Sequence, residues 1–170
     1  MARYNRWINE RLYAAAGTLT EADRQQARGA FFGSIHRTLQ HLVVADQIWL
    51  KRFLPTAMAQ QVDCSMLGPA VLDLPAVYTL DMQLFADWPA LLAKRSQLDA
   101  AIEAWAEGFT PAFVDATMRY GNSSGVQREH PAWQALTHFF NHQAHHRGQA
   151  TTLLSQAGVD VGVTDLVALL

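Results

Sequence analysis

Cysteine is nearly absent from this sequence. Its one cysteine, Cys64, cannot form a disulfide within the chain, and no second cysteine lies near it to complete a metal site. We therefore expect Cys64 to have no role as a metal ligand. The N-terminal sequence MARYNRWINE also lacks the apolar core of a signal peptide. Together these two features predict a cytoplasmic protein.

An excess of charge of one sign is also missing. The 13 Lys and Arg residues and 15 Asp and Glu residues give a formal net charge of -2, which provides no basic surface for nucleic-acid phosphates. The chain also lacks an uncharged apolar run of the roughly 18 to 20 residues that a membrane span needs. We expect no nucleic-acid partner and no membrane span, and favour a small molecule or a protein as partner.

What the chain does have is apolar residues in a helical pattern. Half of its 170 residues are hydrophobic, enough for the core of a single domain covering residues 1–170. An all-α four-helix bundle of the up-down type with one long crossover, Pro55 to Tyr78, is the expected fold. Four segments show helical periodicity: Arg3 to Gly17, Gly33 to Leu54, Leu80 to Gly108 and Pro131 to Gln156.

Local signals mark some of the boundaries. Thr79 is a candidate N-cap for the third helix, although Pro89 should kink that helix or mark a later start. Pro131 suits the first turn of the fourth helix, and Gly158 suits its C-terminal cap. Between the third and fourth helices, the sequence Gly121-Asn122-Ser123-Ser124-Gly125 predicts a small hairpin or excursion.

Histidines are the most distinctive feature of the fourth helix, where four of the seven in the chain fall within nine residues. On a helical wheel, His146 lies inside the apolar stripe and His142 lies at its edge. His138 and His145 fall outside the stripe. Two imidazoles four residues apart are separated by about 6 Å along the axis, so both can reach one ion.

This spacing alone does not establish a metal site, because core histidines commonly serve as hydrogen-bonded packing and such pairs also arise by chance. A third ligand on another helix would strengthen the case, since zinc or nickel needs at least three protein ligands to bind firmly. On the second helix, His41 borders the apolar side, whereas His36 falls in the polar arc and is expected to be solvated. His41, His142 and His146 are therefore the predicted ligands.

Asp46 and the tryptophans complete the set of residues that need an explanation. The wheel places Asp46 among apolar residues, where an unpaired carboxylate is costly. A salt bridge to Arg147 or Arg6 is the favoured interpretation, and a role in orienting a ligand or as a base is the alternative. We expect packing or pocket-wall roles for the five tryptophans: Trp7, Trp49, Trp88, Trp105 and Trp133.

Two long stretches resemble the DinB family of bacterial four-helix-bundle proteins. They are HLVVADQIWLKRF (residues 41–53) and HFFNHQAHHRGQATTLLSQAGVD (residues 138–160), and the terminal sequences ARYNRWINERLY and GVTDLVALL are also similar. The resemblance implies that the metal ligands are the histidine of the second helix, here His41, and both histidines of H-x-x-x-H-R-G-Q, here His142 and His146. These are the three residues that the helical wheel selects.

The resemblance further implies zinc or nickel as the metal and often a homodimer. Some relatives are transferases or isomerases that use a low-molecular-weight thiol, while most have no assigned reaction. A metal-dependent enzyme of the thiol-dependent S-transferase or hydrolase type, with an open position on the ion, is our leading hypothesis. No familiar catalytic motif occurs in the sequence, so no catalytic base is assigned.

The alternative is a non-catalytic protein in which the ion joins two helices and the surface serves stress response or protein association. A position on the ion that solvent can reach would favour the enzyme. A closed site completed by His138, His145 or Asp46 would favour the alternative.

Overall fold

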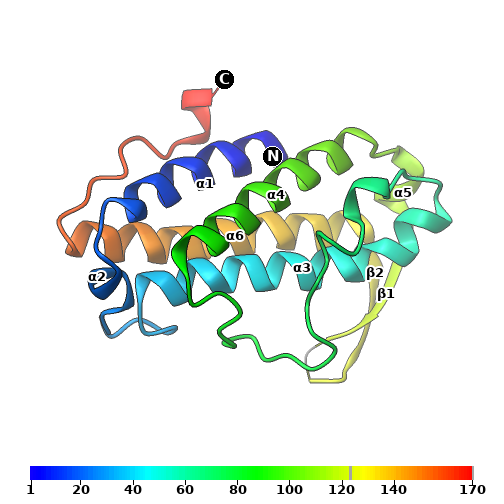
Figure 1. The fold of residues 1–170 in the computed structure, drawn as a ribbon. Coiled ribbons are helices and arrows are strands. Elements are labelled where there is room, and N and C mark those ends of the chain that lie inside the picture. The colour runs from blue at the N-terminus through cyan, green and yellow to red at the C-terminus, as the bar shows by residue number, and fades with distance from the viewer. Residues whose placement is uncertain (123, 170) are drawn as a thin grey trace.

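Helices make up most of the structure, a computed structural model that describes residues 1–122 and 124–169 (Figure 1). The mainly helical fold expected from the sequence is confirmed. In chain order the elements are α1 (Ala2–Gly17), α2 (Glu21–Gln25), α3 (Ile35–Ala59), the 3-10 turn η1 (Ser65–Leu67), α4 (Trp88–Glu107), α5 (Pro111–Asp115), β1 (Thr117–Gly121), β2 (Gln127–Pro131), α6 (Ala132–Gln156) and the 3-10 turn η2 (Leu166–Leu169).

The four long helices pack along their lengths. Helix α3 lies against α6 and α4, and α1 lies against α4 and α6 (Figure 1). Near its C-terminus the chain passes back over α1, and there the Tyr4 hydroxyl donates a hydrogen bond to the Thr164 carbonyl at 2.7 Å. The pairing of α3 with α6 brings the predicted ligands together, because His41 belongs to the first helix and His142 and His146 to the second.

Two predicted helix boundaries are wrong. Helix α3 continues through Pro55 to Ala59, where the buried Phe53 and Ala57 anchor the turns on either side of the proline. Helix α4 begins at Trp88 and not at Leu80, because the Asp87 side chain caps it by accepting from the Ala90 N–H and Pro89 occupies its first turn. The crossover therefore runs from residue 60 to residue 87.

The predicted hairpin is confirmed as an antiparallel pair of strands. Thr117 pairs with Pro131 at one end of the ladder and Gly121 with Gln127 at the other. Gly125 has a φ of 76° in the connecting turn, a conformation that glycine adopts without steric cost. Ser123, the central residue of the predicted turn, lies outside the described residues.

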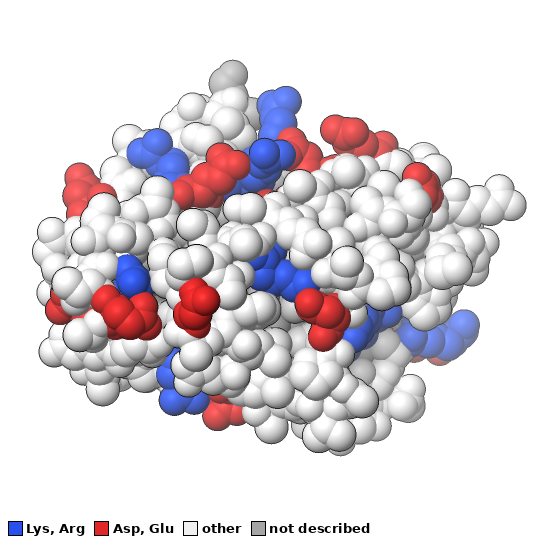
Figure 2. Space-filling view, viewed as in Figure 1, with Lys and Arg blue, Asp and Glu red and all other residues white. Residues whose placement is uncertain are grey.

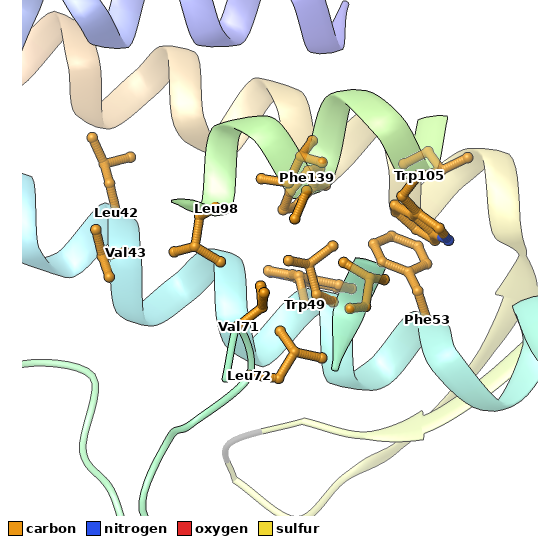
Figure 3. Packing of buried hydrophobic residues seen from close by; sticks show 14 of the residues in the cluster. Leu42, Val43, Trp49, Phe53, Val71, Leu72, Leu98, Trp105 and Phe139 are labelled. Atoms are coloured by element: carbon orange, nitrogen blue, oxygen red, sulfur yellow. The ribbon is translucent and has the colours of Figure 1, made fainter. Parts of the chain in front are cut away.

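Aromatic side chains from three helices fill the end of the core that faces the hairpin (Figure 3). Phe53 of α3 packs 5.4 Å from the Trp105 ring of α4 and 6.0 Å from the Phe139 ring of α6, measured between ring centroids. Burying one such side chain contributes about 2 to 3 kcal/mol to stability. A packing or pocket-wall role was expected for Trp133, but this residue lies on the outer side of α6 with 47% of its surface exposed.

A buried polar cluster crosses the middle of the helical core. Asp46 of α3 accepts from Arg95 of α4 at 2.6 Å and from the Gln143 side chain of α6 at 2.6 Å. Arg95 also lies 2.9 Å from Asp99, which in turn accepts from Asn9 of α1 at 2.8 Å. The cluster therefore links all four long helices and fixes α3 and α6 relative to each other.

The predicted partners of Asp46 were wrong. Arg6 lies on the outer side of α1, where it pairs with Glu10 and Glu103. Arg147 is buried but hydrogen-bonds Asn5. A cation from α4, Arg95, takes the position instead, because α4 packs directly against α3 at this level.

Charged side chains are sparse on the face seen in Figure 2, where acidic and basic residues are interspersed and neither sign forms a continuous patch. Among the described residues, no helix combines the length and apolar character required to cross a bilayer.

Candidate metal centre

Three histidines meet between α3 and α6. Each of His41, His142 and His146 offers a ring nitrogen, and the three nitrogens lie within 4.8 Å of one another, close enough to bind one ion. The Nε2 atoms of His142 and His146 are 3.1 Å apart. The four-residue spacing on α6 accounts for this pair, and the packing of α6 against α3 supplies the third ring.

In two of these histidines Nδ1 donates a hydrogen bond, which leaves Nε2 unprotonated and able to bind a metal. The Nδ1 atom of His41 lies 2.9 Å from the Leu80 carbonyl oxygen, which can only accept, so Nδ1 carries the proton. Nδ1 of His146 lies 2.8 Å from Oε1 of Gln149, which fixes the same tautomer. Nε2 of His41 is buried and has no hydrogen-bond partner among the described residues. A buried lone pair without a partner is costly, and a metal ion at this point would satisfy it.

Burial keeps the rings in the neutral form that binds metal. It lowers the pKa of His41 to about 4, with His146 adding to the effect and the bond to Leu80 opposing it. It also lowers the pKa of His142 to about 3, helped by the neighbouring imidazoles. The pKa of His146 is lowered as well, again chiefly by burial. At neutral pH protons therefore do not compete with an ion for these nitrogens.

A cavity of about 670 Å³ opens onto the three histidines. Phe32 forms part of its wall and stacks on the His41 ring, with the ring centroids 4.0 Å apart. Its rim includes Phe31 and Leu80, which are 87% and 43% exposed. A space of this size accommodates a small molecule next to the histidines.

Polar side chains near the N-terminal end of α3 hold the crossover against the cavity. The Gln40 side chain donates to the Met82 carbonyl at 2.7 Å and accepts from the Phe85 N–H at 2.7 Å. One turn earlier, Nε2 of His36 lies 2.6 Å from the Phe85 carbonyl oxygen. These hydrogen bonds between α3 and the crossover place Leu80, whose carbonyl orients His41, at the rim of the cavity.

His36 is therefore not a solvated surface residue, as its place in the polar arc predicted. It is fully buried, because residues 82–85 of the crossover cover that arc. Helical periodicity detects polar faces but does not show that a loop will cover one of them. The repeated polar residues His36, Gln40 and His41 would have been the only signal for it.

The remaining candidate ligands lie outside the three-residue group. His138 and His145 are exposed on α6, as their wheel positions predicted. The His138 ring packs 4.8 Å from the Trp49 ring, and His145 lies 3.2 Å from the Gln149 amide. Asp46 is held by Arg95 and Gln143, and Cys64 lines a different cavity. In the described part of the chain, none of these completes a fourth position.

Sequence reasoning missed Gln149 and the Leu80 carbonyl, which orient two of the ligand rings. Gln149 follows His146 by three residues, which places both on one side of the helix. Its place in H-R-G-Q could have pointed to it. The Leu80 contribution comes from a backbone atom and therefore leaves no signal in the choice of side chain.

Comparison with known proteins shows the family of this chain. The sequence pattern described as the DinB family matches residues 1–170. The chain belongs to the DinB family. It is 23% identical over 168 residues to "Protein DinB" of Bacillus subtilis (strain 168). The aligned region covers 95% of this chain and 87% of that protein. No solved structure matches the chain.

Proposed function

We propose that this DinB-family protein is a metal-dependent enzyme whose ion, zinc or nickel, is bound by His41, His142 and His146. The observation that carries the proposal is the buried Nε2 of His41, which has no hydrogen-bond partner among the described residues and lies with two further imidazoles beside an open cavity. Imidazole is a favourable ligand for both metals, and three protein ligands leave a position for a substrate.

A divalent ion held by these three histidines would lower the pKa of bound water or of a bound thiol, and so would make a nucleophile available at neutral pH. The chain contributes the rest. Leu80 and Gln149 hold two ligand rings in the metal-binding tautomer. Phe32 shields the His41 ring on one side. The reaction class that we propose is a thiol-dependent S-transfer or a hydrolysis, with a low-molecular-weight thiol as the leading candidate for the small-molecule partner.

The alternative is that the ion only joins α3 to α6 in a non-catalytic protein that acts in stress response or protein association. Two features favour the enzyme over this alternative. Asp46, His138 and His145, which were the candidates for closing the coordination sphere, all lie outside the ligand group. The cavity beside the histidines also has the volume of a small-molecule site and not that of a closed structural site.

The decisive experiment is metal analysis of protein purified without an affinity tag, followed by thiol-transfer and hydrolysis screens of the loaded protein. We expect about one zinc or nickel ion per chain, and a turnover that is absent from His142→Ala. Matched protein carrying His145→Ala should retain both. A fully loaded protein that is inactive across both screens would favour the non-catalytic alternative.

For the whole molecule, we propose an up-down four-helix bundle that forms a homodimer in the cytoplasm. Support for a dimer comes from the outer side of α6, where no exposed residue is acidic or basic apart from the histidines. Exposed Trp133 lies on this side of the helix. Light scattering at micromolar concentration should give about twice the mass of the chain, and a monomeric mass would contradict the dimer.

A further inference from the structure

Arg37 is the one cationic side chain, other than histidine, among the described residues that line the cavity at the three histidines. It lies on α3 four residues before His41, and thus about 6 Å further along the same helix. Its side chain is 43% exposed. A group that binds Arg37 can therefore belong to the same small molecule as a group that reaches the histidines.

The guanidinium of Arg37 has donors to spare. Among the described residues, it makes one hydrogen bond, from Nη2 to the Asp81 carbonyl oxygen at 3.2 Å. The Asp81 carboxylate lies 3.9 Å from the same nitrogen and is 67% exposed, so this ion pair is weak. An arginine has five N–H donors in a planar fork that matches a carboxylate. A carboxylate in the cavity could therefore displace the Asp81 side chain.

The charge of the site also favours an anion. Its three ligands are neutral imidazoles, which would leave the charge of a divalent ion uncompensated. The buried carboxylate nearest to them along α3, Asp46, is already paired with Arg95. Asp81 is the one acidic side chain of the cavity in the described chain, and it only balances Arg37. The loaded cavity would thus carry net positive charge and attract anions.

Apolar surface lies around the same opening. Phe31 is 87% exposed and Leu80 is 43% exposed, and both line the cavity. Covering a large exposed aromatic ring with the apolar part of a ligand favours binding, because it removes apolar surface from water. The three features together describe a ligand with a metal-binding group, a carboxylate one helical turn away and an apolar part between or beside them.

We propose that Arg37 binds the carboxylate of the substrate, so that the natural thiol of this protein is a carboxylated one. This inference rests on the function proposed above. Arg37 acts as a specificity residue here, since it binds a group that does not react. The sources of the carboxylate that fit are small thiols derived from amino acids or short peptides.

Calorimetric titration of the zinc-loaded protein with N-acetylcysteine and N-acetylcysteinamide tests the proposal, because the two thiols differ only in having a carboxylate or an amide. The wild type should bind the acid about tenfold more tightly than the amide, a ratio typical of one charge-assisted contact. Arg37→Gln should reduce that ratio to about one and leave the affinity for the amide unchanged. Asp81→Asn should increase the ratio, since it removes the competing carboxylate.

Arg119→Gln is the matched control. This arginine lies on the hairpin, outside the cavity, and pairs with Glu129, so its loss makes the same change in net charge. The control should keep the tenfold ratio. The proposal is wrong if Arg37→Gln keeps it too, or if this variant loses affinity for acid and amide equally, which would assign Arg37 to holding the crossover.

A second pair of ligands separates this inference from the proposed function. A hydroxamate with a carboxylate and the same hydroxamate with an amide bind zinc without a thiol. If neither thiol binds but the carboxylated hydroxamate is preferred in an Arg37-dependent way, the thiol function fails and the anion subsite stands. If the thiols bind without preference for the acid, the thiol function stands and the assignment of Arg37 fails.

Discussion

Gln149 determines which nitrogen of His146 faces the site. Because its Oε1 accepts from Nδ1, Nε2 is left as the metal-binding atom. Groups that orient a metal-binding histidine typically contribute 10- to 100-fold to metal affinity. We expect Gln149→Ala to weaken zinc binding by about tenfold or more in competition with a chromophoric chelator. Gln134→Ala, at an exposed glutamine of the same helix, should leave the affinity unchanged, and an equal loss in both variants would contradict this role.

The buried imidazoles should make the metal-free protein sensitive to acid. The pKa of His41 is about 4 in the folded chain, against 6.5 for an ordinary histidine. Between these values the unfolded chain binds a proton that the folded chain does not, so stability is present above pH 6.5 and is lost as the pH falls towards 4. For His41 alone the loss by pH 5 is on the order of 2 kcal/mol.

Urea denaturation of chelator-treated protein at several pH values measures this loss. His41→Gln cannot titrate, so its stability should fall less steeply between about pH 6.5 and pH 5. Parallel curves for the wild type and the variant would show that His41 is not a source of the acid sensitivity.

For single residues, the predictions from the sequence were correct at some positions and wrong at others. Sequence reasoning placed His41, His142 and His146 on inward faces, because helical periodicity reports the angle of a side chain directly. It misplaced His36, whose polar arc is covered by the crossover. It also missed Arg95 as the partner of Asp46, because the rotation and height of one helix against another depend on packing across the whole interface.

At the scale of elements, the contact between α3 and α6 matters most, since it assembles the site. Asp46 receives hydrogen bonds from Arg95 and Gln143, and all three residues are buried. Removing one partner of a buried pair leaves an uncompensated charge and typically costs 3 to 5 kcal/mol. We expect Arg95→Met to destabilise the protein by about this amount and to lower zinc affinity as well, because α3 and α6 would shift.

Arg119→Met provides the comparison, since its ion pair with Glu129 is exposed at both ends. Arg119→Met should lower the free energy of unfolding by less than about 1 kcal/mol, measured by chemical denaturation. Similar losses in the two variants would show that the buried cluster does not position the helices.

Element boundaries followed local chemistry where that chemistry was unambiguous. The hairpin was predictable from its glycines, and α6 from Pro131 and the periodicity that follows it. The start of α4 was ambiguous, because Thr79 and Asp87 are both good N-caps and only Pro89 favours the second. The path of the crossover could not be predicted, since it depends on backbone carbonyls that accept from α3.

At the scale of the whole molecule, an ion shared by α3 and α6 should stabilise the fold. A ligand that binds only the folded chain adds about 2.7 kcal/mol when its concentration is a hundred times its dissociation constant. Zinc should therefore raise the melting temperature of the wild type by several degrees. It should not raise that of His41→Ala, whereas the two proteins should melt closer together in the presence of a chelator, and an equal zinc response in both would contradict a shared ion.

Metal content measured by mass spectrometry on untagged protein tests the three-histidine site most directly. His41→Ala, His142→Ala and His146→Ala should each lose the ion, because two remaining ligands are too few for firm zinc or nickel binding. His36→Ala and His145→Ala should keep about one ion per chain, although His36 is buried, because neither belongs to the ligand group. Full occupancy in His142→Ala, or a loss in His36→Ala as large as that in His41→Ala, would contradict the assignment.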